Sequence, residues 1–401
     1  MQRLKSHVER FFQTLSAQSA LGAGNQPKTP ATYGIVLSGG GARAAYQAGV
    51  LQYVADHLES PNLDIITGVS AGSINAAQLA NDQGTFQQSV SNLITGWSEL
   101  DADDVYKASN SFTFLLKLIK GSSDKETELL PRAGLVDTAP LSEYLKKILH
   151  APDGTIQGIR KNINSGKLKA CAVVTTDYST AQTVTWVEGR AMEGGERPNR
   201  ISRQTQLSVD HIMASTSLPF LFPAIPIHNH FYGDGGIRQA EPLSPAVHLG
   251  ATKILAISTR YSRTMEQALI PVAAGYPPAA QIFGVLLNAV FLDRLDQDAM
   301  TLERTNKMVA QLAQESRLGM KHIDLLVMRP SQDLGKLSSE FQHDLKGVLS
   351  LIARGLGSSD TESPDWLSMI LFDNAYTSKL IQIGYDDSKA KHDKLAAFFA
   401  A

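Results

Sequence analysis

The sequence has a single cysteine and almost no net charge. Cys171 is the only cysteine among 401 residues, which excludes an intramolecular disulfide and a metal cluster built from several cysteines. The formal net charge is −2, and no block of lysines and arginines resembles a nucleic-acid-binding arm. We therefore expect a protein of a reducing compartment that has no nucleic-acid partner.

Long apolar runs are missing as well. The N-terminal stretch lacks the apolar segment of a secretory signal, and no part of the chain approaches the length of a membrane span, about 18 apolar residues. Residues 1–18 instead place apolar side chains at helical spacing, namely Leu4, Val8, Phe11, Phe12 and Leu15. The polar face of this helix is not strongly basic, which favours docking on the protein body over anchoring to a membrane. We expect residues 1–30 to form a helix and linker of a soluble, cytoplasmic protein, with peripheral membrane association as the alternative.

The pattern from Tyr33 onward predicts an alternation of strands and helices. The strand "YGIVL" is followed by a glycine turn, a helix near 42–58, the strand "LDIIT" and the helix "SINAAQLAN", which together form a βαβ unit and indicate a parallel sheet. Further strands are predicted at "LKACAVVTTDY", "TVTWVEG", "KILAIST" and "HIDLLVMRPS", and further helices near 137–149, 207–217, 240–249 and 279–315. We predict an α/β fold with a mainly parallel sheet between two layers of helices.

Two stretches interrupt this alternation. Residues 101–136 contain the apolar patch and polar break "SFTFLLKLIKGSSDKE", which could form a lid over a site or a helix that covers the core. Residues 331–401 have a helical pattern and are expected to pack on the sheet. We therefore predict a main domain over residues 31–330 and a helical C-terminal region over 331–401.

The segment "TGVSAGS" has the pattern of a nucleophile elbow. Ser70 stands between Gly68 and Gly72, after an apolar strand and before a helix made of small residues. A sharp strand-to-helix turn needs small neighbours, and it exposes the serine hydroxyl at the edge of the sheet. A plain turn with Ser70 as a helix cap is the alternative, but this context favours a nucleophile.

The glycine turn "SGGGAR" allows two interpretations. Gly39, Gly41 and Ala44 fit a dinucleotide-binding fingerprint, but that motif expects an acidic ribose ligand at the end of the second strand, where Ser70 stands instead. A phosphate loop of the Walker A type lacks its Gly-Lys-Ser/Thr. Because the ends of neighbouring parallel strands meet, the glycine turn should lie beside Ser70 and bind an oxyanion formed during catalysis.

The base that would activate the serine is harder to find. Asp234 follows a short aromatic strand and precedes Gly235 and Gly236, so it should lie on a tight turn that permits close approach to another loop. A histidine base is the alternative, with candidates after Asp234 at His248, His322, His343 and His392. The H-x-H pair of His228 and His230 has no third ligand motif, and His211 and Met213 lie on a predicted helix. We expect a structural or surface role for the H-x-H pair and a packing role for His211 and Met213.

Taken together and in this order, the motifs resemble the patatin-like phospholipase family. They are "SGGGARAAYQAGVL", "GVSAGS", "MASTSLPFLFPAI" and "DGGIRQAEPL", which cover roughly residues 34–245, and the tail "IGYDDSKAKHDKLAAFF" resembles the C-terminal part of bacterial members. Three of these motifs, "SGGGARAAYQAGVL", "GVSAGS" and "DGGIRQAEPL", are functional, and together in one order they are far more specific than any single one.

The resemblance implies a serine acyl hydrolase with a Ser-Asp dyad. By this similarity Ser70 is the nucleophile and Asp234 the general base, and the oxyanion loop comprises Gly39–Gly41, closed by the basic residue Arg43. No metal or organic cofactor is implied, and the expected partner is a lipid or fatty ester. A catalytically silent lipid-binding module of the same fold and a nucleotide-binding protein are the competing hypotheses.

Overall fold

The computed structural model describes residues 30–59, 62–108, 134–194, 196–269, 279–344 and 365–400. The contacts of the chain divide it into Met1–Ala31 and Thr32–Ala401, and the description below concerns the second unit. The predicted helix within 1–18 and the stretch "SFTFLLKLIKGSSDKE" of the predicted lid or covering helix lie outside the described residues.

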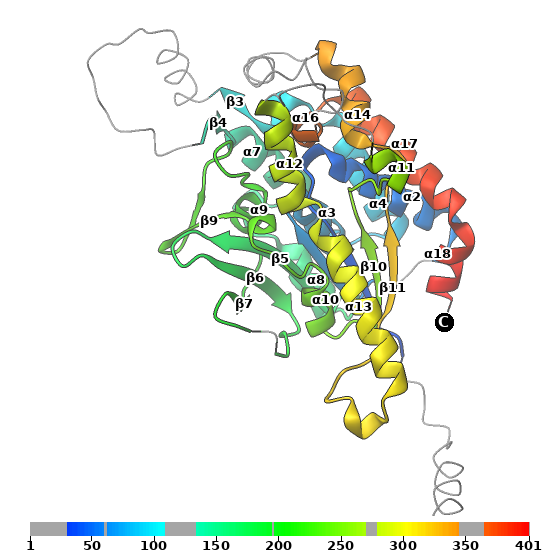
Figure 1. The fold of residues 1–401 in the computed structure, drawn as a ribbon. Helices are drawn as coiled ribbons and strands as arrows, with labels where there is room; N and C mark the ends of the chain where they lie inside the picture. The colour runs from blue at the N-terminus through cyan, green and yellow to red at the C-terminus, as the bar shows by residue number, and fades with distance from the viewer. Residues whose placement is uncertain are drawn as a thin grey trace, which may run out of the picture. The chain divides into compact units, whose positions relative to one another are not determined.

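A mixed nine-stranded sheet forms the centre of this unit (Figure 1). Its parallel part runs in the order β11 (Asp324–Met328), β10 (Lys253–Ile257), β1 (Tyr33–Leu37), β2 (Ile65–Val69) and β5 (Ala170–Asp177). Next to β5 lie β6 (Gln182–Gly189) and β9 (His230–Asp234), both antiparallel to it; β6 continues to β7 (Arg200–Gln204), and β9 to β8 (Ile225–Ile227). The predicted mainly parallel α/β sheet is confirmed, and its antiparallel pairs are those of β5 with β6, β5 with β9 and β9 with β8.

Helices cover both faces of the sheet because its central strands are apolar on both sides. Ile35 and Leu37 of β1 belong to one core cluster and Val36 to the other. The first face carries α2 (Ala45–His57), α3 (Ala71–Asn81), α4 (Phe86–Glu99), α9 (Val209–Thr216) and α17 (Asn374–Ala390). The second carries α10 (Ser244–His248) and α13 (Arg294–Gln311), and Figure 1 shows α13 in front of the sheet. This three-layer arrangement agrees with the prediction.

Some local predictions were wrong. The single helix expected over 279–315 is two, α12 (Ala279–Phe291) and α13, separated at Leu292 and Asp293 and followed by the short η3 (Gln314–Ser316). Helices α4 and α8 (Gln157–Asn164) were not predicted, although Thr85 and Gln88 form a capping box at the start of α4.

The other described elements are short or lie near the ends of the gaps. They are η1 (Gly41–Ala44), α5 (Ala102–Val105), β3 (Lys107–Ala108), β4 (Val136–Asp137), α7 (Ala139–Ile148), η2 (Gly235–Ile237), α11 (Met265–Ala268), α14 (Leu334–Ser338), η4 (Ser339–Asp344), α16 (Asp365–Ile370) and α18 (His392–Phe399). Within the described part of the chain, no helix combines the length and apolar character that crossing a bilayer requires.

Helix α17 packs on α2 with backbone against backbone. A Cβ atom added to Gly49 of α2 would lie 1.9 Å from the carbonyl oxygen of Ile381, and one added to Gly384 of α17 would lie 2.2 Å from that of Tyr46. Both distances are far shorter than any van der Waals contact. The two glycines therefore let the C-terminal helix approach the helix that directly follows the glycine turn.

We expect Gly49→Ala to destabilise the protein because the new methyl group would push α17 away from α2. The loss should reach about 2 kcal/mol or more in the free energy of unfolding, as in overpacked cores, when measured by denaturant unfolding. Asp56→Ala, at an exposed position of the same helix, is the control and should change this free energy by no more than about 0.5 kcal/mol. Equal stability of Gly49→Ala and wild type would contradict the close packing.

Candidate active site

Ser70 lies in a strained turn between β2 and α3. Its φ and ψ are 53° and −136°, a conformation that costs free energy for a residue with a Cβ atom. A Cβ atom on Gly68 would lie 2.4 Å from the carbonyl oxygen of Gly72, and one on Gly72 would lie 2.3 Å from that of Leu37. Glycine at both positions thus allows the sharp strand-to-helix turn that was predicted around Ser70.

The register of the sheet brings Asp234 next to Ser70. Val69, which precedes the serine, pairs with Val174 of β5, and the next residue of β5, Thr175, pairs with Asp234 on the same side of that strand, since β6 occupies the other side. The hydroxyl of Thr176 donates a hydrogen bond of 2.8 Å to the carbonyl oxygen of Asp234 and fixes this end of β9. Two residues 164 positions apart in sequence, 70 and 234, are therefore neighbours at one edge of the sheet.

The carboxyl group of Asp234 is fully buried and has few partners. Its Oδ1 accepts a hydrogen bond of 2.8 Å from the backbone N–H of Gly236, whereas Oδ2 has no hydrogen-bond partner among the described residues. Burial raises the pKa of Asp234 to about 7, against the opposing effects of the nearby Ser70 hydroxyl and the Gly236 N–H. Ser70 and Asp234 are thus close but form no hydrogen bond of ordinary geometry, and Oδ2 remains able to accept a proton.

The glycine turn after β1 presents its backbone to Ser70. A Cβ atom on Gly39 would lie 2.9 Å from the Cβ of Ser70, and the hydroxyl of Thr259 donates a hydrogen bond of 2.6 Å to the Gly39 carbonyl. Gly40 and Gly41 have φ values of 143° and 57°, which residues with side chains rarely adopt. The N–H groups of Gly39–Gly41 donate no hydrogen bond to any described residue, so they are available to an anion.

The side chain of Arg43 does not join this group of donors. Its Nε donates to the Ser368 hydroxyl over 2.6 Å, and its Nη2 to Asp365 Oδ1 over 2.7 Å, both on α16. Arg43 is buried and does not line the cavity at Ser70. The assignment of Arg43 to the oxyanion loop stays a prediction, and its side chain links that loop to the C-terminal region.

Ser215 is a residue of the site that sequence reasoning missed. Its hydroxyl accepts a hydrogen bond of 3.0 Å from the backbone N–H of Ser70 and donates one of 2.7 Å to the carbonyl oxygen of Val174. It thereby ties the strained turn to β5. The motif "MASTSLPFLFPAI" drew attention to this segment, but only the packing of α9 shows which hydroxyl contacts Ser70.

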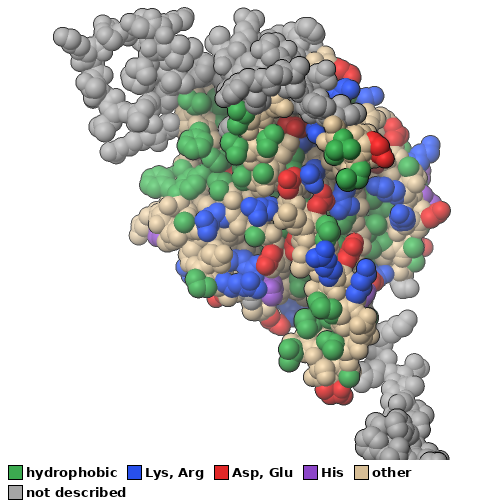
Figure 2. Space-filling model, in the orientation of Figure 1, with side chains coloured by type: hydrophobic (Ala, Val, Ile, Leu, Met, Phe, Trp, Pro, Cys, Tyr) green, Lys and Arg blue, Asp and Glu red, His purple; other side chains and the backbone are tan. Residues whose placement is uncertain are grey.

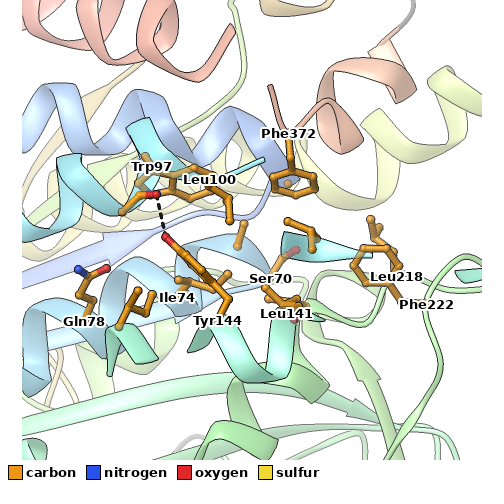
Figure 3. Close-up of a pocket in the computed structure, with 16 residues that line it drawn as sticks. Ser70, Ile74, Gln78, Trp97, Leu100, Leu141, Tyr144, Leu218, Phe222 and Phe372 are labelled. Carbon is orange, nitrogen blue, oxygen red and sulfur yellow. Dashed lines mark hydrogen bonds between the residues drawn. The ribbon is translucent and has the colours of Figure 1, made fainter. Parts of the chain in front are cut away.

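Ser70 opens into an apolar cavity (Figure 3). Tyr144, on α7, donates a hydrogen bond of 2.7 Å to the carbonyl oxygen of Gly96, so its hydroxyl is satisfied within the wall. Phe372, just after α16, contributes a wall from the C-terminal region. The other lining side chains are mainly apolar and include Ile74, Trp97, Leu100, Leu141, Leu218 and Phe222, with Gln78 as a polar member. Such a cavity suits an apolar group next to the Ser70 hydroxyl.

No histidine lines this cavity in the described part of the chain. Three of the candidate bases have other partners: His248 contacts the Glu193 carbonyl, His322 contacts Asp324, and His392 contacts Tyr53. The side chain of the fourth, His343, lies outside the described residues. The geometry therefore favours Asp234 as the base.

His211, His228 and His230 do not line the cavity either. His230 contacts Asp177 over 2.7 Å, and His211 forms the capping box of α9 with Ser208. Burial lowers the pKa of His211 to about 4, so it is neutral at pH 7. His228 has a positive φ of 53°. Among the described residues there is no group of three or more ligands that could hold a metal ion.

Comparison with known protein families accounts for the combination of a glycine turn, a serine in a strained turn and a buried aspartate. The model of the patatin-like phospholipases matches residues 35–247, more than half of the chain, and this range contains the glycine turn, Ser70 and Asp234. The chain belongs to the patatin-like phospholipase family. Membership implies that a lipid acyl hydrolase activity is the expected chemistry of the site.

Individual relatives within and around this family are distant. An uncharacterised protein of Acanthamoeba polyphaga mimivirus is 26% identical over 216 residues, which cover 52% of this chain and 60% of that protein. Human GIVD cytosolic phospholipase A2 in complex with methyl gamma-linolenyl fluorophosphonate has a TM-score of 0.44 and 12% identity over 92% of this chain and 59% of its own. VipD from Legionella pneumophila has a TM-score of 0.38 and 12% identity, over 91% of this chain and 67% of the VipD chain.

The raised pKa of Asp234 predicts a pH-dependent cost in stability. Its ordinary value is 3.8 and its folded value about 7, so between these values the folded state binds more protons than the unfolded state. The free energy of unfolding should therefore fall as pH rises through this window, by up to about 1.4 kcal/mol per pH unit, and level off above it.

Asp234→Asn should remove the part of the pH dependence of the unfolding free energy that comes from Asp234. We expect the variant to gain stability relative to wild type as pH rises from about 4 to 7, measured by denaturant unfolding at several pH values. A difference between the two proteins that stays constant over this range would argue against the buried carboxylate.

Proposed function

We propose that this protein is a serine acyl hydrolase that cleaves carboxylic ester bonds of phospholipids, lysophospholipids or other fatty esters. The observation that carries the proposal is a fully buried Asp234, with a pKa near neutrality and one oxygen without a partner, beside Ser70. A carboxylate is a weak base in water, and desolvation supplies the basicity that proton abstraction from a hydroxyl requires.

The proposed reaction has two halves. In the first, the Ser70 hydroxyl attacks the ester carbonyl while Asp234 accepts its proton, and the tetrahedral intermediate then expels the alcohol, which takes that proton. In the second, Asp234 accepts a proton from the water that attacks the acyl-enzyme, and the tetrahedral intermediate then releases the fatty acid while the departing Ser70 oxygen takes that proton back from Asp234. The free N–H groups of Gly39–Gly41 would stabilise the oxyanion in both halves by about 3 kcal/mol per donor. No step requires a metal or organic cofactor.

The surroundings of the site support a lipid substrate. The cavity wall is apolar, as an acyl chain requires. Leu218 and Phe222 of this wall flank Phe220, whose side chain is 86% exposed. On the face shown in Figure 2, exposed hydrophobic side chains gather over β9 and α12. This apolar surface suits transient contact with a membrane or another lipid aggregate.

Ser70→Ala and Asp234→Asn should each lower hydrolysis of p-nitrophenyl butyrate by about a thousandfold or more, since nucleophile and base act as a unit. Wild-type kcat/KM should rise with pH and be half-maximal near the pKa of Asp234, about 7, because only the ionised carboxylate accepts a proton. A fluorophosphonate probe should label wild type at Ser70 and leave Ser70→Ala unlabelled.

Three outcomes would count against this assignment. Full activity in folded Ser70→Ala would exclude the serine mechanism. A wild-type protein that binds fatty-acid ligands but resists both the ester and the fluorophosphonate would instead be a catalytically silent lipid-binding module. Thermal stabilisation by a dinucleotide would support the competing nucleotide-binding hypothesis.

Phe220→Ser should distinguish lipid aggregates from soluble esters. Loss of one aromatic contact with the lipid should lower hydrolysis of phospholipid vesicles about fivefold, equivalent to about 1 kcal/mol of apolar burial, while hydrolysis of p-nitrophenyl butyrate stays unchanged. The matched control is Leu318→Ser, because Leu318 is 88% exposed in the loop after η3. An equal loss in both variants, or on both substrates, would show that Phe220 does not contact the lipid.

A further inference from the structure

Asp365 joins two elements that frame the candidate site. It is the first residue of α16, and its side chain is 16% exposed. Its Oδ1 accepts a hydrogen bond of 2.7 Å from Arg43, which belongs to η1 at the glycine turn. Its Oδ2 accepts one of 2.6 Å from Asn288 of α12. One carboxylate therefore connects the glycine turn to α12.

The contact with Arg43 determines where the glycine turn lies. Arg43 is 3% exposed, and Ser368, one turn further along α16, accepts a second hydrogen bond from its Nε. A Cβ atom on Gly41 would lie 1.8 Å from the carbonyl oxygen of Met369, so the turn rests directly on the α16 backbone. Because a buried guanidinium needs a counter-charge, the Asp365 contact holds this arrangement in place.

The contact with Asn288 determines how α12 covers the base. Asn288 stands three residues before Phe291 at the end of α12. A Cβ atom on Gly236 would lie 2.4 Å from Cδ1 of the Phe291 ring, and the N–H of Gly236 is the hydrogen-bond donor to Asp234. The end of α12 thus packs on the turn that carries Asp234, whose side chain is fully buried.

We propose that Asp365 is a positioning residue that holds the oxyanion-binding turn and the helix over Asp234 in one fixed arrangement. The inference rests on the proposed function. A tetrahedral intermediate needs N–H donors where its charge develops while the base stays close to the nucleophile, and small displacements of either group are costly. Asp365 links the two supports through a single side chain.

The test compares Asp365→Asn with wild type as full-length proteins. With p-nitrophenyl butyrate, kcat should fall about tenfold or more while KM changes less than about twofold, because donors to the transition state are misplaced and ground-state binding is retained. The acid limb of the pH profile should also move to lower pH, since water admitted under α12 reduces the desolvation of Asp234.

Two further variants separate the contacts. Ser368→Ala removes the hydroxyl that accepts from Arg43 and donates to the Asp365 carbonyl oxygen but leaves the Asn288 contact in place, so it should lower kcat and leave the pH profile unchanged. Asn288→Ala releases only α12, so it should move the pH profile with a smaller effect on kcat. The reverse pattern would overturn the assignment of the two contacts.

Glu188→Gln is the matched control. Glu188 is also a buried carboxylate with two partners, Arg160 and the N–H of Leu207, but it pairs in register with Cys171 near the start of β5, away from the edge that carries Asp234. The Glu188→Gln variant should be less stable than wild type, without a change in kcat or in the pH profile of hydrolysis. If Asp365→Asn behaves in the same way, its role is merely structural and the inference is wrong.

A second measurement does not depend on activity. The unfolding free energy of wild type is compared with that of Asp234→Asn, and that of Asp365→Asn with that of the double variant, between about pH 4 and 8. In each pair the difference changes with pH, and the midpoint of this change reports the ionisation of Asp234. The midpoint should be lower in Asp365→Asn. Wild type without esterase activity would refute the proposed function alone, whereas identical midpoints would refute the coupling through Asp365.

Discussion

The carboxylate of Asp234 lies inside the protein with no cationic partner among the described residues. Ionising it there costs free energy, because one backbone N–H and a nearby serine hydroxyl replace a full hydration shell. That cost raises the pKa of Asp234 to about 7. The carboxyl group stays buried where β9 pairs with β5, and the Phe291 ring packs on the adjoining turn.

The backbone of Ser70 is also held in an unfavourable state, in this case a strained conformation. Its backbone conformation persists because neighbouring groups fix it on several sides: Gly68 and Gly72 leave room, and Ser215 binds its N–H. The strained backbone of Ser70 and the desolvated carboxyl group of Asp234 are both unfavourable for folding. The apolar packing of the central sheet and of α2 against α17 stabilises the fold in which they occur.

Much of this arrangement could be predicted from the sequence because it depends on short segments. The βαβ pattern around residues 33–81 determines that the glycine turn and Ser70 lie at neighbouring strand ends, and the three ordered motifs are specific. The direction of the Arg43 side chain could not be predicted, since its partners Asp365 and Ser368 are more than 320 residues away. The role of Ser215 depends on how α9 packs, and the break between α12 and α13 falls within a continuous helical pattern.

Phe372 carries a consequence for comparing members of this family. The family model ends at residue 247, yet this ring forms part of the wall that an acyl chain would touch, and it comes from a segment that begins more than a hundred residues later. Two chains with identical motifs could therefore differ in substrate preference through C-terminal segments that diverge freely in sequence and length. Grouping such proteins by their shared motifs would sort them by reaction chemistry, while their choice of substrate would follow the part of the chain that the motifs leave out.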